Sequence, residues 1–81
     1  MITKDSIETA YCFFHQKFQV YRYSTLDWQK DDIEMAIGAY VDEMNCDLYA
    51  ALAQGRAHYL KDSATFSADL ADAVAHLEHM L

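Results

Sequence analysis

Four residues near the C-terminus are of the types that bind divalent metal ions. Asp69, Asp72, His76 and His79 follow one another at intervals of three, four and three residues. In an α-helix this spacing places them on one face, where carboxylate oxygens and imidazole nitrogens can bind Zn²⁺ or a similar ion. A site on a single helix lacks enclosure and supporting hydrogen bonds. We therefore favour a solvated polar face and keep metal binding as an alternative hypothesis.

No other pattern in the sequence indicates catalysis or a bound cofactor. Nucleophile elbows, P-loops, dinucleotide-binding glycine motifs, zinc-protease motifs and paired CxxC motifs are all absent. Acidic neighbours surround Cys46 and disfavour the thiolate that a nucleophile requires. We expect Cys12 and Cys46 to be buried, reduced and inert. The prediction is a protein without enzymatic activity and without a cofactor.

Negative charge is concentrated in the second part of the chain. The net charge is -7, and residues 31–81 carry ten acidic residues against only Arg56 and Lys61. Nucleic-acid binding requires clustered basic residues and is therefore disfavoured. A protein partner with a basic surface is favoured electrostatically. The candidate contact residues for such a partner are Asp31, Asp32, Glu34, Asp42 and Glu43.

Apolar residues recur with the period of an α-helix. The sequence contains no proline and only two glycines, so few residues interrupt helices. Three stripes follow the three-and-four spacing of a helix with one buried face. They are Ile7, Tyr11, Phe14, Phe18 and Tyr21; Ile33, Ile37, Tyr40 and Met44; and Leu70, Val74, Leu77 and Leu81. This pattern predicts a single all-α domain over residues 1–81, an antiparallel bundle of three to four helices.

Capping residues predict where the first two helices begin. Thr3 is expected to cap a helix that begins around residues 4 to 6, with Ile2 and Ile7 spaced as a hydrophobic staple. Asp5 with Glu8 offers an alternative capping box. Ser24 is expected to cap a second helix over residues 25–45. Tyr23 and Trp28 have the spacing of a hydrophobic staple across that cap.

The later breaks are less sharply marked. Near Asn45 the sequence permits either a bend, which we favour, or a complete stop with Asp47 capping a new helix. The third segment, residues 47–61, is rich in alanine and is expected to be helical. Ser67 is the predicted start of the last helix.

A strip of aromatic residues runs from Tyr11 to Tyr23, where six of thirteen residues are aromatic. Most of the strip falls on one helical face and is expected to be core. Residues 18–23 also alternate as an edge strand would, although the longer periodicity favours helix. Phe13 and Val20 lie together on a second face. This patch either packs on another helix, which we favour, or forms an exposed surface for a partner or a homodimer.

These observations predict a small acidic, non-catalytic protein-interaction module. It would act as an adaptor, inhibitor or regulator of a basic protein, with Phe13 and Val20 as apolar anchors beside the acidic residues. We expect a cytoplasmic location, since neither an apolar signal sequence nor a membrane span occurs. The alternatives are a metal-binding helical protein and a homo-oligomeric bundle without separate activity.

Overall fold

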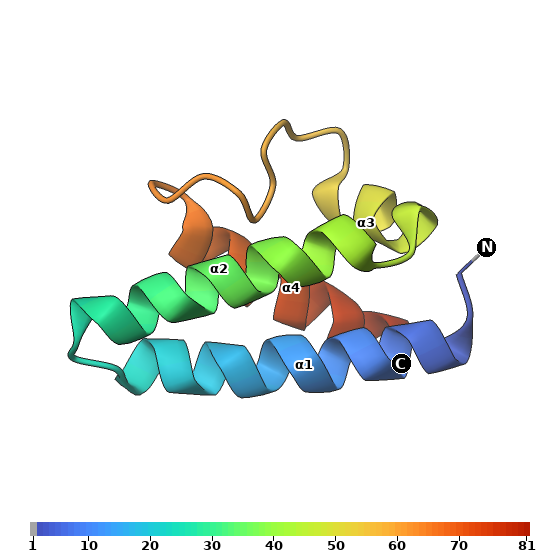
Figure 1. The fold of residues 1–81 in the computed structure, drawn as a ribbon. Coiled ribbons are helices and arrows are strands. Elements are labelled where there is room, and N and C mark those ends of the chain that lie inside the picture. Colours follow the sequence, from blue (N-terminus) through green and yellow to red (C-terminus); the bar gives the residue numbers. More distant parts are fainter. Residues whose placement is uncertain (1) are drawn as a thin grey trace.

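Four α-helices and no strand form the regular structure of residues 2–81, the part of the chain that the computed structural model describes. They are α1 (Lys4–Tyr23), α2 (Asp27–Glu43), α3 (Cys46–Ala53) and α4 (Phe66–Met80). Helices α1 and α2 form an antiparallel hairpin (Figure 1). The prediction of a small all-α bundle is confirmed. None of the described helices has both the length and the apolar character needed to cross a membrane.

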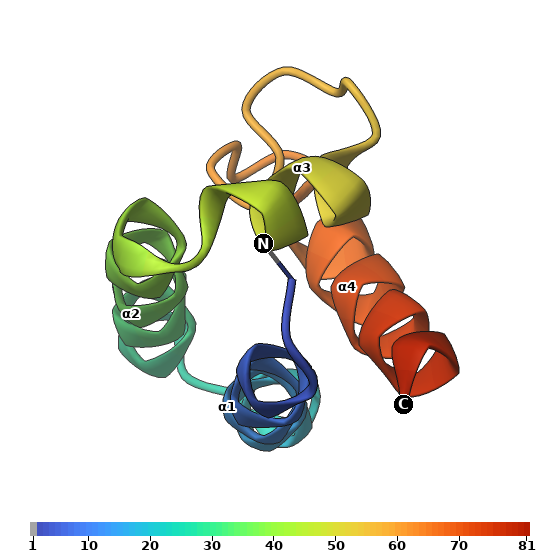
Figure 2. The same cartoon turned by 90° about the vertical axis from the view of Figure 1, so that its right-hand side faces the viewer.

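Helix α1 is the element on which α2 and α4 pack. It contacts α4 most extensively and α2 next, while α3 contacts α4. Seen along α1, the helices α2 and α4 flank it on two sides, and α3 lies across from it (Figure 2). The segment 54–65, between α3 and α4, has no regular helix and passes over the same side as α3.

The core receives side chains from every helix and from the segment 54–65. Burying a large apolar side chain stabilises a fold by about 1.5–3 kcal/mol. The predicted stripes supply much of this core, although several of their members are only partly buried, and Leu81 is 54% exposed. The largest fully buried side chains are Phe14, Ile37, Leu48, Leu52, Tyr59, Leu60, Phe66, Leu70 and Leu77.

The start of α1 follows the predicted cap. The side chain of Thr3 accepts a hydrogen bond from the backbone N–H of Ser6 at 3.1 Å, and the Ser6 hydroxyl accepts one from the Thr3 N–H at 3.1 Å. This capping box satisfies two amides that a helix start leaves unpaired. The helix then continues to Tyr23, so residues 18–23 are helical and the extended alternative is excluded.

The predicted cap of α2 is wrong. Because α1 remains helical to Tyr23, Ser24 has to terminate α1, and its backbone N–H bonds to the carbonyl of Tyr21. The Ser24 hydroxyl donates to the side chain of Gln29 at 2.7 Å, and Leu26 occupies the cap position of α2 without a side-chain hydrogen bond. Helix α2 therefore begins two residues later than predicted. Tyr23 and Trp28 are 74% and 60% exposed and form no staple.

The favoured bend near Asn45 is also wrong, because α2 stops completely. Met44 is extended, and the Asn45 side chain caps α3 by accepting hydrogen bonds from the N–H groups of Asp47 and Leu48. Helix α3 ends at Ala53, well short of residue 61, because the next residue takes a left-handed conformation. Helix α4 begins at Phe66, one residue before the predicted start.

Both cysteines are exposed, which contradicts the expectation of buried thiols. Cys12 lies two residues before the buried Phe14, a separation of about 200° around the helix, so it points away from the core. Cys46 is the first residue of α3 and is also exposed. The two thiols are therefore exposed because of where each cysteine lies in its helix.

Phe14 and Val20 provide a direct test of the core assignment. Phe14 is fully buried, so Phe14→Ala should lower the free energy of unfolding by about 3–5 kcal/mol. Val20 is 50% exposed, so Val20→Ala should change it by no more than about 0.5 kcal/mol. Urea unfolding followed by far-ultraviolet circular dichroism measures both. Similar losses in the two variants would show that the core is misassigned.

Candidate functional site

The five predicted acidic residues lie on α2 but form two groups. Asp31, Asp32 and Glu43 are exposed, and within residues 2–81 no ion pair or hydrogen bond engages their carboxylates. Glu34 is partly buried, and both it and Asp42 turn towards the segment that precedes α4. The first group is exposed, whereas the second makes contacts with the segment 54–65.

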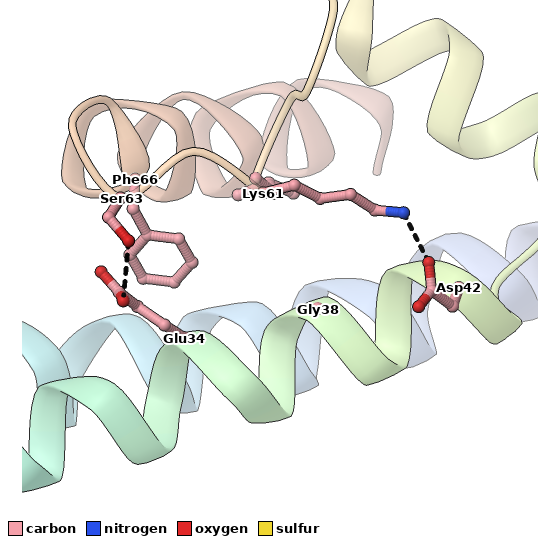
Figure 3. Close-up of a pocket in the computed structure, with 7 residues that line it drawn as sticks. Glu34, Gly38, Asp42, Lys61, Ser63 and Phe66 are labelled. Atoms are coloured by element: carbon pink, nitrogen blue, oxygen red, sulfur yellow. Dashed lines mark hydrogen bonds and ion pairs between the residues drawn. The ribbon is translucent and has the colours of Figure 1, made fainter.

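Glu34 and Asp42 border an open cavity of about 190 Å³, here called the α2 groove. At one end the Ser63 hydroxyl donates to the Glu34 carboxylate at 3.3 Å, and at the other Lys61 pairs with Asp42 at 2.5 Å. Gly38 lies on α2 between these two contacts (Figure 3). The lining residues are Glu34, Gly38 and Asp42 on α2, with Leu60, Lys61, Ser63 and Phe66 opposite.

At the Glu34 end of the groove, Tyr21 lies near the carboxylates of Glu34 and Asp31 and near the ammonium of Lys30, which is 5.8 Å from its ring centroid. The Tyr21 ring packs edge-on against Phe66, with ring centroids 5.2 Å apart. Burial raises the pKa of the Tyr21 hydroxyl, and the nearby carboxylates of Glu34 and Asp31 raise it further. Negative charge close to the hydroxyl disfavours its ionised form. The carboxylates of Glu34 and Asp31 that disfavour an ionised tyrosine would favour a cation placed beside them.

Two large apolar side chains are exposed on the outer side of α2. Trp28 is 60% exposed and Met35 is 74% exposed. They are seven residues apart, two turns of helix, and share that side with Asp31 and Asp32. Sequence reasoning did not select them as anchors. Their position opposite the buried Ile33 and Ile37 stripe is the signal that would have found them.

The predicted Phe13 and Val20 patch is divided by the structure. The ring of Phe13 stacks on Tyr40 of α2, with centroids 4.3 Å apart and an interplanar angle of 12°. The Lys17 ammonium lies 5.6 Å from the centroid of the same ring. Phe13 therefore packs on another helix, as favoured, while Val20 is 50% exposed. The two side chains do not act as one surface.

Asp69 is buried and holds the segment 54–65 against α4. It is 9% exposed, and its Oδ2 accepts hydrogen bonds from the backbone N–H of Leu60 and from the Thr65 hydroxyl, both at 3.1 Å. A buried carboxylate is tolerated when such donors satisfy it. The predicted solvated face is therefore wrong at this position, because Asp69 is enclosed by the chain that precedes its own helix.

Asp72 forms a second anchor, here called the Asp72 cluster, with Arg56 and Tyr59. The Arg56 guanidinium and the Tyr59 hydroxyl donate to the same Asp72 oxygen at 2.8 and 2.9 Å. The guanidinium also stacks 4.2 Å from the centroid of the Tyr59 ring. Sequence reasoning missed Arg56 and Tyr59, since they lie 16 and 13 residues from Asp72 and no short motif connects them.

The Asp72 cluster fixes the protonation of its members. Burial alone would raise the pKa of Asp72, but hydrogen bonds from Arg56 and Tyr59 outweigh it and lower the pKa. Burial raises the pKa of Tyr59 strongly, and its hydrogen bond to Asp72 adds to this effect. Asp72 is therefore an ionised acceptor and Tyr59 a protonated donor at neutral pH.

The other two residues of the predicted metal face on α4 are His76 and His79. The Nε2 atom of His76 lies 3.6 Å from an Asp72 oxygen, and His79 is exposed. Across residues 2–81, no group of three or more His, Cys, Asp or Glu side chains is arranged to hold a metal ion. Since Asp69 and Asp72 are occupied by the segment 54–65, the metal hypothesis gains no support from this geometry.

Comparison of the chain with protein-family models, with curated proteins and with solved structures gives no match. No function can therefore be transferred from a relative.

The lowered pKa of Asp72 predicts a pH-dependent stability difference. Asp72→Asn should lower the free energy of unfolding by about 1 kcal/mol at pH 7, a modest loss because the side chain is 36% exposed. Ionised Asp72 stabilises the fold above its unfolded pKa of about 3.9, and this contribution disappears as the pH falls through the lower folded value. The difference between wild type and variant should therefore shrink between about pH 5 and pH 2.

Urea denaturation across this pH range measures the difference. Glu78→Gln is the matched control, because Glu78 is exposed on the same helix. A pH-independent difference for Asp72→Asn, or an equal loss in the control, would show that the Asp72 cluster does not stabilise the fold.

Proposed function

We propose that the chain is a small non-catalytic module that binds a basic protein partner through the outer side of α2. One observation carries this proposal: Trp28 and Met35 stand exposed on a helix side that also bears the carboxylates of Asp31 and Asp32. Exposed apolar side chains rimmed by charge are typical of protein interfaces.

The two kinds of side chain have separate roles in binding. Carboxylates attract a basic surface over a distance and raise the association rate, which makes binding sensitive to salt. Aromatic side chains buried on binding supply most of the affinity. Trp28 is therefore the proposed anchor, and Asp31, Asp32 and Glu43 are the steering charges. Asp42 contributes less, because Lys61 already neutralises it.

We place this activity in the cytoplasm. The thiols of Cys12 and Cys46 are exposed and unpaired, and such thiols persist in a reducing compartment. An adaptor, an inhibitor and a regulator would all use the same surface, and the identity of the partner decides among them.

The proposal predicts a salt-dependent complex whose formation needs the α2 charges. Tagged protein incubated with its native lysate at low and high salt, followed by mass spectrometry, identifies the candidate partner. With the purified partner, the double variant Asp31→Lys, Asp32→Lys should lower the association rate at least about tenfold at low salt, and less at high salt. Trp28→Ala should raise the dissociation rate by about tenfold or more.

A second double variant provides the control for net charge. Glu8→Lys with Glu78→Lys reverses two exposed acidic residues away from α2. An equal loss of association in this control would mean that overall charge, and not the α2 surface, governs binding. Recovery of the chain alone, with a mass in light scattering that is a multiple of 9.3 kDa, would replace the proposal with the homo-oligomeric alternative.

A further inference from the structure

No close packing contact requires a glycine at position 38. It lies in the interior of α2, where glycine destabilises a helix relative to alanine because of its backbone freedom. A Cβ atom built at this position would meet nothing within 4 Å. The space that an ordinary side chain would enter is the α2 groove. Glycine thus lowers the stability of α2 at the position in the middle of the groove, Gly38.

The lining of the groove defines what could occupy it. A volume of about 190 Å³ is below the roughly 300–1,000 Å³ of sites for whole small-molecule ligands, and suits a single side chain. Leu60 and Phe66, each about 1% exposed, form the apolar floor of the groove opposite Gly38. Among the residues that line the groove, the carboxylates of Glu34 and Asp42 stand against one positive charge, that of Lys61. The groove therefore suits an elongated group with an apolar stem and a positive end.

Glu34 is the carboxylate that remains able to bind such a group. Its only hydrogen bond among the described residues comes from Ser63 at 3.3 Å, whereas an ionised carboxylate can accept about four. Asp31, one turn earlier on α2, adds negative charge nearby. At the other end of the groove, Asp42 is already paired with Lys61.

We infer that the α2 groove binds an arginine side chain of the basic partner, with its methylene groups beside Gly38 and Leu60 and its guanidinium on the Glu34 carboxylate. The inference rests on the proposed function and adds the site where one partner side chain enters. The planar guanidinium donates two parallel hydrogen bonds to a carboxylate, which the compact ammonium of lysine cannot do. An anion would be repelled by the same carboxylates.

A titration of ¹⁵N-labelled protein with N-acetyl-arginine methylamide tests the groove without the partner. Saturable chemical-shift changes are expected at the amides of Gly38, Lys61 and Ser63, with a Kd on the order of millimolar. Gly38→Leu fills the groove and should weaken this binding at least tenfold. The same substitution should raise Tm by a few degrees, because leucine is a better helix former than glycine. A loss of binding then cannot result from unfolding.

Matched controls isolate each feature of the site. Ala39→Leu enlarges the neighbouring exposed residue, which does not line the groove, and should leave the Kd unchanged. Glu34→Gln should weaken binding severalfold by removing the charge that faces the guanidinium. N-acetyl-lysine methylamide should bind severalfold more weakly, and guanidinium chloride, which has no stem, should give no saturable change.

Three results would overturn the inference: no saturable change at the groove amides, equal binding by Gly38→Leu, or the same changes with guanidinium chloride. Binding of the identified partner separates this failure from failure of the proposed function. A partner that is sensitive to Asp31→Lys with Asp32→Lys but indifferent to Gly38→Leu removes the groove inference and keeps the proposed function. Arginine binding in a chain without a basic partner removes the proposed function and keeps the groove as an arginine site.

Discussion

The hydrogen bonds from the segment 54–65 to Asp69 and Asp72 hold the longest irregular part of the described chain against α4. Among the described residues of this segment, Gln54, His58 and Leu60 have positive φ, a backbone conformation that costs free energy in residues other than glycine. The two carboxylates compensate by accepting from Leu60, Thr65, Tyr59 and Arg56. Helix α4 thus fixes a segment whose own backbone hydrogen bonds belong to isolated turns.

The surface along α2 is a consequence of this anchoring. Leu60 is buried while the next residue, Lys61, reaches across to Asp42, so the anchored segment forms the second wall of the α2 groove. On the outer side of the same helix, Trp28 and Met35 are exposed because the core needs only the opposite stripe. One helix therefore carries exposed apolar side chains, exposed carboxylates and a groove, the three features on which the proposed binding of a basic protein rests.

The sequence predicted features that depend on neighbouring residues, such as helical stripes and a cap. It did not predict features that depend on contacts between residues far apart in the chain. The stripes and the Thr3 cap were predicted because helical spacing and capping act within a few residues. The Ser24 cap failed because that residue ends α1 before it could begin α2. Of the candidate site, the acidic residues on α2 were predicted from charge. The groove was not, since Gly38 and Leu60 come to line one cavity only in the folded chain.

Amide hydrogen exchange at Leu60 tests the anchoring most directly. The Leu60 N–H donates to Asp69, not to a backbone carbonyl, so its protection depends on one side chain. Slow exchange is expected in the wild type, with loss of protection in Asp69→Ala while amides within α4, such as that of Leu77, keep theirs. A Leu60 amide that exchanges freely in the wild type, or remains protected without the Asp69 carboxylate, would contradict the anchoring of the segment by α4.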